Sequence, residues 1–283
     1  MSALDLDHLA RIAEARAGTH ATKVRYPIGL RELQVLDVSR LGTGLVRVTL
    51  GGDDLQGFES HVPDEHVRLI FPDPDGTLRL PERDGPSLRW PRPLPVSREY
   101  TVRRYDQAAG VLDIDIAIHP GGVGSDWATT VRVGERIHVA GPPGGFVVPD
   151  RYTRYLFAGD ITALPQIARW LEMLPPTTTG WAFIEVGDAS ERIELTAPPG
   201  VEVRWVYRGG LPPGHGDALE RAVRTVRLPS DDEPTFVWFA AEADVLKPLR
   251  RFVRDELGVP PADCHITGYW KRGVADFEDH DHE

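Results

Sequence analysis

The sequence predicts a protein of class β + α/β: an antiparallel β-barrel followed by an α/β domain with a parallel sheet. Two observations carry this prediction. Short β-rich segments separated by turn residues fill the chain up to residue 141, whereas strands and helices alternate from residue 150 onwards. The 283 residues are enough for one large domain or two of ordinary size. We place the boundary between two domains near Pro149.

A short helix precedes the barrel in this prediction. Apolar residues recur at three- and four-residue spacing within residues 4–17, which is typical of an amphipathic helix. These residues are Leu6, Leu9, Ala13 and Ala17. We therefore assign residues 1–30 to an N-terminal helix and extension outside the two domains.

Residues 31–149 form the predicted barrel. This range contains six β-rich runs, namely ELQVLDV, LVRVTL, HVRLIF, EYTVRRY, LDIDIAI and RIHVAG. Turn-forming clusters such as LGTG, PDPDG, DQAAG and RVGE separate the runs. Short strands joined in this way indicate an antiparallel barrel or sandwich.

Residues 150–273 form the predicted α/β domain. Its strand candidates are RYLFAG, WAFIEV, VEVRWVY, TFVWFAA and CHITGYW, and its helix candidates are ITALPQIARWLEML, DALERAVRTV and ADVLKPLRRFVRDELG. Their alternation indicates a parallel sheet with crossover helices. The remaining residues, 274–283, are acidic and are expected to be disordered.

Composition limits the class of protein and its location. Apolar residues make up 41% and charged residues 27%, and no run approaches the roughly 20 apolar residues that a membrane span needs. The first residues lack the basic and apolar regions of a secretory signal, and a single cysteine, Cys264, cannot form an intramolecular disulfide. We therefore expect a cytoplasmic protein with no membrane insertion.

The net charge limits the partners. At −11, the chain repels phosphate at long range, which disfavours nonspecific binding to nucleic acid or to an anionic membrane surface. An anionic ligand would need a local concentration of positive charge. We expect no nucleic-acid partner and a monomeric state.

The stretch SREYTVRRY, residues 97–105, contains a cation, a flat ring and a small hydroxyl close together. At the rise of a strand, Arg98, Tyr100 and Thr101 lie within about 10 Å of one another. Such a set suits a flat anionic ligand. In a regular strand, however, Thr101 faces away from the other two, so ordinary cross-strand packing explains the trio equally well.

The stretch IHPGGVGSDWA, residues 118–128, runs from a strand through glycines into a serine and the start of a helix. Glycines allow a ligand close to the backbone, and a helix N-terminus with the Ser125 hydroxyl forms an anion site, so this is a candidate pyrophosphate cradle. A glycine-rich connection with Ser125 as an ordinary N-cap is the alternative. Neither this stretch nor GPPGG matches the G-x-G-x-x-G fingerprint.

The segment LFAGDITALPQI joins the first strand of the α/β domain to its first helix. The strand ends in Gly159 and Asp160, and Thr162 follows in the loop. Open α/β sheets bind ligands at this end of their strands. On its own, the segment is an ordinary strand-to-helix turn in which the threonine caps the helix.

The segment GYWKRG closes the predicted fold with two aromatic residues beside two cations. Tyr269 and Trp270 could stack on a planar ring, and Lys271 and Arg272 could bind an anionic substrate. A strand edge with solvated charges is the alternative.

The histidines and the cysteine predict neither a metal site nor a hydrolase. His61 and His66 flank VPDE, and His280 and His282 lie in the acidic tail, but neither pair has the spacing of a zinc motif. The sequence contains no G-x-S-x-G motif, and Cys264 begins a predicted strand, where a buried inert thiol is expected.

Eight segments, in this order, resemble the siderophore-interacting proteins, a branch of the ferredoxin:NADP reductase superfamily. They are RLGTGLVRVTLGGDDLQGF, HVRLIFP, SREYTVR, IHPGGVGSDWA, VGERIHVAGPPGGF, AGDITALPQIARWLEMLP, WVYRGG and GYWKRG, and they span roughly residues 31–273. The resemblance implies a FAD-binding β-barrel and an NAD(P)H-binding α/β domain. It further implies reduction of the Fe(III) of a ferric siderophore, with NADPH or NADH as electron donor.

The resemblance also implies roles for residues of the barrel. The family's R-x-Y-[ST] motif falls on Arg98, Tyr100 and Thr101, which would contact the pyrophosphate, the isoalloxazine and the edge of the flavin ring respectively. The stretch that continues the FAD site corresponds to His119, Gly124, Ser125, Trp127 and Ala128. Val123 and Gly124 depart mildly from the family's pattern before the serine.

In the second domain, the family's A-G-D-x-T-A-L-P segment corresponds to Asp160, Thr162 and Ala163, at the flavin and nicotinamide junction. Further cofactor candidates are Arg208, for the adenosine ribose or its 2′-phosphate, and the aromatic pair Tyr269 and Trp270. The expected siderophore-binding cations are Lys247, Arg250, Lys271 and Arg272. No catalytic side chain and no protein-bound metal is implied, because the electrons pass through the flavin.

The chemistry agrees with a flavin. A hydride carries two electrons whereas Fe(III) accepts one, so a cofactor that can pass electrons singly is needed. Two other functions stay open at this point. One is a flavin reductase of the same superfamily that acts on a quinone, free flavin or a protein, and the other is a noncatalytic module that binds a siderophore or nucleotide.

Overall fold

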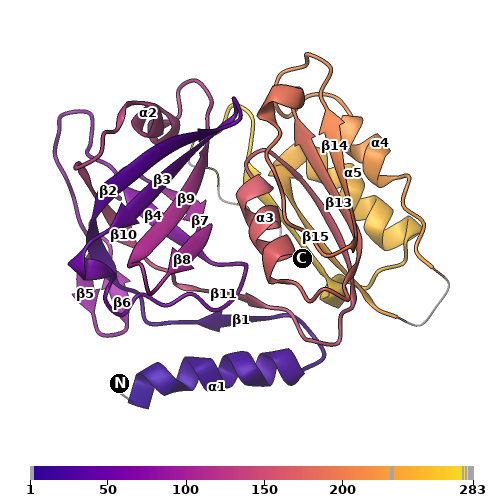
Figure 1. Ribbon diagram of the computed structural model, residues 1–283, viewed down its shortest axis with the longest axis horizontal. Helices are drawn as coiled ribbons and strands as arrows, with labels where there is room; N and C mark the ends of the chain where they lie inside the picture. Colours follow the sequence, from indigo (N-terminus) through magenta and orange to yellow (C-terminus); the bar gives the residue numbers. More distant parts are fainter. Residues whose placement is uncertain (1–2, 230–232, 276, 278, 280–283) are drawn as a thin grey trace. The chain divides into compact units, whose positions relative to one another are not determined.

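The structure, a computed structural model, describes residues 3–229, 233–275, 277 and 279. The chain divides into two units (Figure 1). Unit 1 comprises Met1–Arg16 and Thr22–Val147, and unit 2 comprises Ala17–Ala21 and Val148–Glu283. Within the described part of the chain, no helix is both long enough and apolar enough to cross a membrane.

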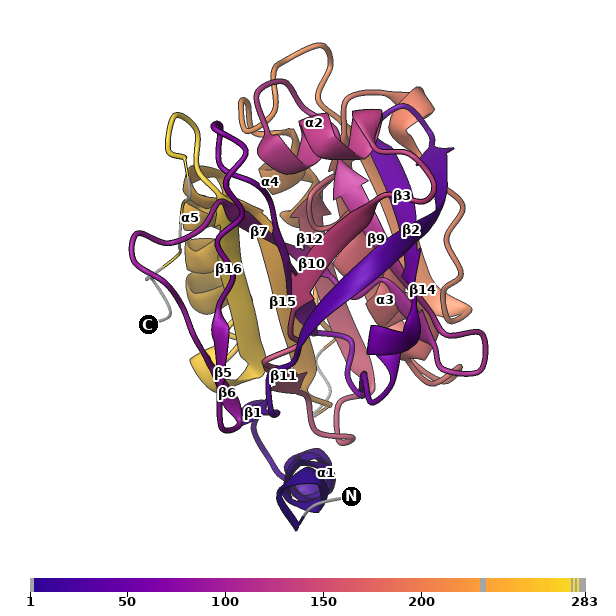
Figure 2. The same cartoon turned by 90° about the vertical axis from the view of Figure 1, so that its left-hand side faces the viewer.

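Unit 1 is built on an antiparallel sheet whose strand order is β7-β4-β10-β2-β3-β9-β8. The strands are β2 (Leu30–Leu41), β3 (Leu45–Gly51), β4 (His66–Ile70), β7 (Ser97–Thr101), β8 (Arg104–Asp106), β9 (Val111–Ala117) and β10 (Arg136–Ala140). Only Val102 and Arg103 separate the two edge strands β7 and β8, and the Arg103 N–H donates to the Asp113 carbonyl of β9. The sheet must therefore curl until its edges meet, which closes a barrel (Figure 2).

Alternate residues of the barrel strands fill its interior. Valine, leucine and isoleucine side chains of β3 and β9 are buried there, namely Val46, Val48, Leu50, Leu112, Ile114 and Ile116. Each such side chain contributes about 1.5–3 kcal/mol when it leaves water. Helix α2 (Val123–Thr130) covers one end of the barrel and adds Ala128 to the same core (Figure 1).

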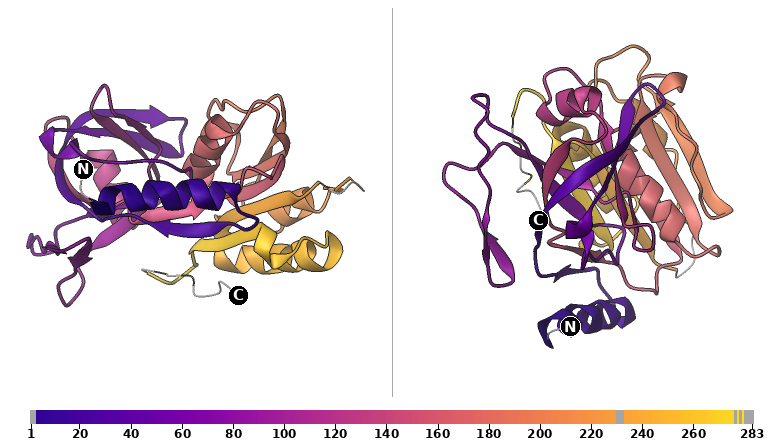
Figure 3. Two further views of the ribbon diagram at one scale, coloured as in Figure 1. Left: turned by 90° about the horizontal axis from the view of Figure 1, so that it is seen from below. Right: turned by 60° about the vertical axis from the view of Figure 1, so that its left-hand side comes forward.

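Helix α1 (Ala3–Ala17) lies beside a two-stranded sheet of unit 1 (Figure 3). In this sheet, β1 (Thr22–Arg25) pairs antiparallel with β11 (Gly144–Val147). A Cβ on Gly144 would lie 1.9 Å from the Val24 carbonyl oxygen, so glycine is required where the two strands pair. The GPPGG stretch therefore serves strand pairing.

The structure differs from the prediction for unit 1 at three places. Strands β1 and β11 were not predicted, and neither was the hairpin of β5 (Glu82–Asp84) and β6 (Ser87–Arg89). The run EYTVRRY, predicted as one strand, is divided between β7 and β8. The helix predicted over residues 4–17 is present as α1.

Unit 2 contains a parallel sheet, as the alternating pattern predicts, and its strand order is β14-β13-β12-β15-β16. The strands are β12 (Arg154–Asp160), β13 (Thr179–Val186), β14 (Gly200–Tyr207), β15 (Thr235–Glu242) and β16 (Cys264–Trp270). Helix α3 (Leu164–Met173) covers one face, and α4 (Ala218–Val223) and α5 (Ala243–Arg251) cover the other (Figure 1). Short turns are η1 (Asp53–Leu55), η2 (Ala189–Glu191), η3 (Phe252–Glu256) and η4 (Pro261–Asp263).

The predicted disorder of residues 274–283 concerns in part residues 276, 278 and 280–283, which lie outside the described residues. At the described residue Asp279, the buried carboxylate accepts hydrogen bonds from Arg250 and from the Gly268 N–H of β16. Asp279 therefore contacts Arg250 and β16, and the disorder of the tail stays a prediction.

Candidate functional site

Arg98 and Tyr100 share one face of β7, as strand alternation predicts. Both side chains are half-buried, whereas Ser97 and Thr101 are buried. The strand continues to Thr101 without interruption, so the Thr101 side chain lies on the opposite face. The structure thus brings two of the three predicted residues together on one surface, and Thr101 lies on the opposite face of the strand.

Tyr100 meets the glycine-rich stretch at Gly124. A Cβ on Gly124 would fall 1.6 Å from the Tyr100 hydroxyl oxygen, so the phenol end of the ring lies directly against α2. Burial raises the pKa of Tyr100 to about 12, which keeps its hydroxyl protonated at neutral pH. The contact joins two sequence motifs that were independent candidates for the same ligand.

Ser125 lies inside α2, because the N-cap of this helix is Gly122. The buried Ser125 Oγ accepts a hydrogen bond of 2.9 Å from the His119 N–H. The alternative in which Ser125 is an ordinary N-cap is therefore wrong. Its hydroxyl ties the end of the preceding strand to the helix.

The N-terminus of α2 carries the features of an anion site. Gly122 makes no side-chain cap, so the first N–H groups of the helix are left for solvent or a ligand. Backbone N–H groups in this position bind phosphate oxygens well. These N–H groups, the Arg98 guanidinium and the Tyr100 ring are the kinds of group that suit the pyrophosphate and the flat ring of FAD.

Trp127 and Ala128 support this end of the barrel from within. Trp127 packs edge-on against Phe71, with 5.8 Å between ring centroids, and Ala128 is buried in the barrel core. Their predicted contact with FAD stays a prediction, whereas their packing holds α2 in place.

In unit 2, Asp160 ends β12 with a carboxylate that accepts four hydrogen bonds. Its Oδ1 accepts from Thr162 N (2.9 Å) and Thr162 Oγ1 (2.6 Å). Its Oδ2 accepts from Glu242 N (3.1 Å) and Trp270 Nε1 (2.8 Å). Asp160 therefore connects β12 with β15 and β16. Thr162 forms a turn with Asp160 through its two hydrogen bonds to the carboxylate. The N-cap of α3 is Ala163. The interpretation of Thr162 as the cap is wrong.

Glu242 forms a second buried centre at the same edge of the sheet. Its Oε2 accepts from the N–H groups of Asp244 (2.8 Å) and Val245 (3.0 Å), which caps α5. Its Oε1 accepts from Arg272 N at 3.1 Å. No role was predicted for this residue, because glutamate is not among the residues that are preferred at a helix N-cap.

Glu185 lies next to Asp160 in register on the neighbouring strand β13. Burial raises the pKa of Glu185 from its ordinary 4.5 to about 7, the Asp160 carboxylate adds to the rise, and the Arg208 guanidinium opposes it. Arg208 is itself buried, and its Nη2 lies 3.7 Å from Glu191 Oε2. Sequence analysis missed Glu185, whose signal was a lone charge in the apolar run WAFIEV.

We expect Glu185→Gln to change the pH dependence of stability. The folded-state pKa is raised above the unfolded value, so the favourable contribution present at low pH is lost as pH rises through about 7. Between pH 5 and pH 8, the wild type should lose about 2 kcal/mol of unfolding free energy relative to the variant. Urea unfolding at a series of pH values measures this difference. Parallel curves for the two proteins would contradict it.

Three of the predicted siderophore-binding cations lie around two carboxylates. The Nζ atoms of Lys247 and Lys271 lie 2.7 Å and 3.9 Å from Asp244 Oδ1. Arg272 Nε lies 3.5 Å from Glu242 Oε1. Each of the three cations thus lies within ion-pair distance of a carboxylate, so an anionic ligand would compete with Asp244 and Glu242 for them. A hollow of about 180 Å³ beside them is lined by Gly214, His215, Gly216, Glu220, Asp244, Val245, Pro248 and Arg272.

The fourth cation, Arg250, is held elsewhere. Its Nη2 donates to the Ile266 carbonyl at 2.9 Å and to Asp279 Oδ2 at 3.0 Å. An anionic substrate would have to compete with Asp279 for this guanidinium.

Tyr269 and Trp270 point to different partners. Tyr269 is partly exposed and packs edge-on against the buried Trp238, with 6.2 Å between ring centroids. Trp270 donates its indole N–H to Asp160, as described above. Tyr269 is therefore the better placed of the two to offer ring surface to a cofactor.

Family models match both units of this chain. The model described as siderophore-interacting FAD-binding domain matches residues 34–146, and the model described as siderophore-interacting protein matches residues 152–273. The first match contains the candidate flavin residues of β7 and α2, and the second contains the carboxylate centres of the parallel sheet.

Proteins with known names are similar over most of the chain. Ferric vibriobactin reductase ViuB of Vibrio cholerae is 32% identical over 231 residues, which cover 81% of this chain and 84% of that protein. The NADPH-dependent ferric-chelate reductase of Escherichia coli is 34% identical over 254 residues, covering 88% and 95%. The crystal structure of a siderophore utilization protein from T. fusca has a TM-score of 0.86 at 40% identity, covering 92% and 99%.

A more distant likeness concerns the fold alone. The cytochrome P450 reductase GcoB of Amycolatopsis aligns with a TM-score of 0.61 at 20% identity, covering 87% of this chain and 72% of that one. A barrel followed by a parallel α/β unit is thus shared with reductases of other acceptors.

Proposed function

Because the chain belongs to the siderophore-interacting protein family, whose models match residues 34–146 and 152–273, we propose that it is a ferric-siderophore reductase. In this proposal it takes electrons from NADPH or NADH and passes them through FAD to the Fe(III) of the siderophore. The observation that carries the proposal is the contact of Tyr100 with Gly124, which supports a FAD-binding surface made of β7, with Arg98, and the N-terminus of α2. Residues 31–149 would hold FAD, and residues 150–273 would bind NAD(P)H.

The electron balance supports a flavoprotein. One NAD(P)H gives up a hydride, which carries two electrons, so it reduces two Fe(III) ions and releases one proton. When bound, FAD supplies the conversion between the hydride donor and the one-electron acceptor. Siderophore oxygen ligands hold the hard Fe(III) tightly and Fe(II) much less well, so release of iron follows its reduction.

The residues of this chain bind and orient the reactants. Arg98 and the first N–H groups of α2 would bind the pyrophosphate, Tyr100 would pack against the isoalloxazine, and Thr101 would support them from the other face of β7. The buried Asp160 and Glu242 fix the edge of the sheet to which the nicotinamide would bind. Arg208 would bind the adenosine ribose or its 2′-phosphate after release from Glu191.

Positive charge for the siderophore would come from a cluster of three cations. Lys247, Lys271 and Arg272 form that cluster, and Arg250 would join it when Asp279 leaves. An overall charge of −11 makes such local focusing necessary for an anionic substrate. We further propose that the protein works as a monomer in the cytoplasm.

The proposal is tested by spectroscopy and kinetics on one preparation. The purified protein should show flavin absorbance after addition of FAD, and this absorbance should bleach with NADPH or NADH under anaerobic conditions. The oxidation of NAD(P)H should then be faster with ferric siderophores than with quinones, free flavin or protein acceptors. Iron reduction no faster than with free flavin alone would exclude a ferric-siderophore reductase, and a protein that never takes up FAD would be a binding module.

We expect Arg98→Ala to weaken FAD binding ten- to a hundredfold, because a charge-assisted bond to phosphate is worth about 1.5–3 kcal/mol. FMN has one phosphate and no pyrophosphate, so its binding should change less than about threefold. Titration of the apoprotein with each flavin, followed by fluorescence quenching, measures both. Arg89→Ala, which removes an exposed arginine paired with Glu82, is the matched control. Equal losses for FMN and FAD would show that Arg98 does not contact the pyrophosphate.

A further inference from the structure

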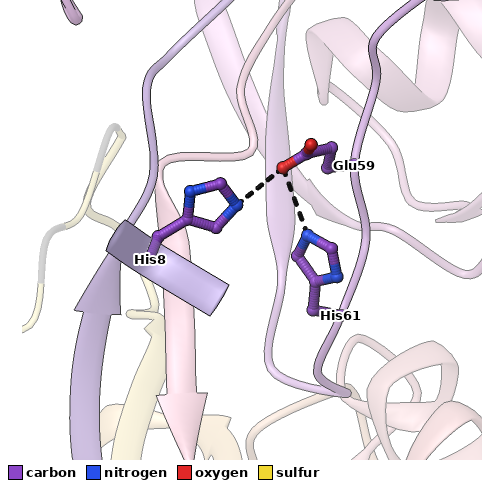
Figure 4. A group of neighbouring side chains, drawn as sticks. All are labelled: His8, Glu59 and His61. Carbon is purple, nitrogen blue, oxygen red and sulfur yellow. Dashed lines mark hydrogen bonds and ion pairs between the residues drawn. The ribbon is translucent and has the colours of Figure 1, made fainter. Parts of the chain in front are cut away.

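Two histidines and a glutamate from distant parts of unit 1 converge on one point (Figure 4). His8 lies on α1, and Glu59 and His61 lie in the loop between η1 and β4. Glu59 Oε2 is 2.6 Å from His8 Nε2 and 3.2 Å from His61 Nε2. The three side chains offer one ligand atom each, and these atoms all lie within 4.8 Å of one another.

We propose that His8, Glu59 and His61 form a binding site for a divalent transition metal ion of the zinc or ferrous class. Two imidazole nitrogens and one carboxylate are a ligand set that both ions use. Ligand atoms around tetrahedral zinc are separated by about 3.4 Å, since each lies about 2.1 Å from the ion. The observed separations therefore reach this geometry through side-chain shifts of about 1 Å.

A fully buried carboxylate holds the loop that carries two of the ligands. Glu65 Oε1 accepts from the Tyr26 hydroxyl (3.0 Å) and from the N–H groups of His61 (2.6 Å) and Val62 (3.1 Å). Its Oε2 accepts from Ser60 Oγ at 2.7 Å. The positions of Glu59 and His61 are thus set by a hydrogen-bonded support, which is what a specific metal site needs.

The third ligand is fixed by the packing of its helix. Ile12 and Ala15 of α1 are buried against Val24, Tyr26 and Val62. The His8 ring packs at a tilt against Tyr26 and His61, with centroid distances of 5.1 Å and 5.5 Å. The position of His8 relative to Glu59 is therefore set by the packing of helix α1.

The site is closed on one side and open on the other. The His8 side chain is 3% exposed, whereas those of Glu59 and His61 are 41% and 24% exposed. An ion could enter from the exposed side and keep water in its remaining coordination position. Bound there, it would fasten α1 to the barrel.

No spacing motif in the sequence indicates this site. His61 was tested against its neighbour His66, but its partner is His8, which is 51 residues from Glu59 along the chain. His66 instead lies 3.8 Å from Glu99. The proposal departs from the prediction of no protein-bound metal, because the contact between His8 and Glu59 is not part of any spacing motif.

Metal binding is tested on the full chain with His280→Gln and His282→Gln, which remove tail imidazoles that could bind zinc themselves. After treatment with EDTA, we expect this protein to bind one equivalent of Zn²⁺ with micromolar or better affinity and a higher midpoint of thermal unfolding. Co²⁺ should give the visible absorbance of a nitrogen- and oxygen-ligated ion. Titration with Fe²⁺ under anaerobic conditions compares the affinity for this ion with the affinity for Zn²⁺. Mg²⁺ should not bind, because it prefers oxygen ligands.

Variants separate the site from adventitious binding. His61→Gln and Glu59→Gln should each weaken Zn²⁺ binding at least about tenfold while FAD uptake and circular dichroism stay unchanged. His138→Gln is the matched control, because His138 Nε2 also faces a carboxylate, Glu32, at 3.9 Å, and should leave affinity unchanged. Absence of saturable binding up to about 100 µM Zn²⁺, or equal affinity in the site variants, would overturn the proposal.

Discussion

Gly124→Ala is expected to weaken FAD binding ten- to a hundredfold without unfolding the protein. The new Cβ would fall 1.6 Å from the Tyr100 hydroxyl and 2.8 Å from its Cζ, so the ring must leave its present position. A displaced ring loses its contact with the flavin, and stacking of this kind is worth about 1–3 kcal/mol. Titration of the apoprotein with FAD measures the loss, and circular dichroism checks the fold.

A second substitution tests whether this clash is the cause. Tyr100→Phe removes the oxygen that the new methyl would meet, so the double variant Gly124→Ala/Tyr100→Phe should regain part of the affinity. Alanine in a helix is otherwise favourable over glycine by about 1 kcal/mol, so Thr130→Ala on the exposed side of α2 controls for helix propensity. If Gly124→Ala binds FAD as the wild type does, Tyr100 does not contact the flavin.

Local patterns predicted most of the elements, because they depend on neighbouring residues. Alternation of apolar residues gave the long barrel strands, and the helical spacing of residues 4–17 gave α1. Pairing between distant segments was beyond such patterns. Strand β11 was not predicted, since the need for Gly144 appears only when β1 pairs with it.

The candidate site was likewise predictable only where it depends on local patterns and not on pairing between distant segments. Strand alternation correctly put Arg98 and Tyr100 on one face and Thr101 on the other. The roles of Glu185 and Glu242 depend on register across the parallel sheet, where Asp160 faces Glu185 and accepts the Glu242 N–H. A single sequence holds no record of that register. For Glu185, the available signal was a lone charge inside an apolar run.

Asp160→Ala is expected to lower the free energy of unfolding by about 3–5 kcal/mol, a loss typical of a broken buried network. The carboxylate accepts four hydrogen bonds, and its removal leaves two buried donors, the Glu242 N–H and the Trp270 indole N–H, without an acceptor. Each such donor costs about 1–3 kcal/mol. Urea unfolding followed by tryptophan fluorescence measures the change, and the released Trp270 should add a shift in emission of the folded protein.

A surface aspartate with the same local geometry provides the matched control. Asp188 Oδ1 accepts from Ser190 N (2.7 Å) and Ser190 Oγ (2.6 Å), as Asp160 does from Thr162, but Asp188 is exposed. Asp188→Ala removes only the turn, so it should cost about 1 kcal/mol or less. The difference between the two variants isolates the contribution of the bonds to β15 and β16. Equal costs would mean that Asp160 stabilises only its own turn, and the edge of the sheet that would receive the nicotinamide would then have to be held by Glu242.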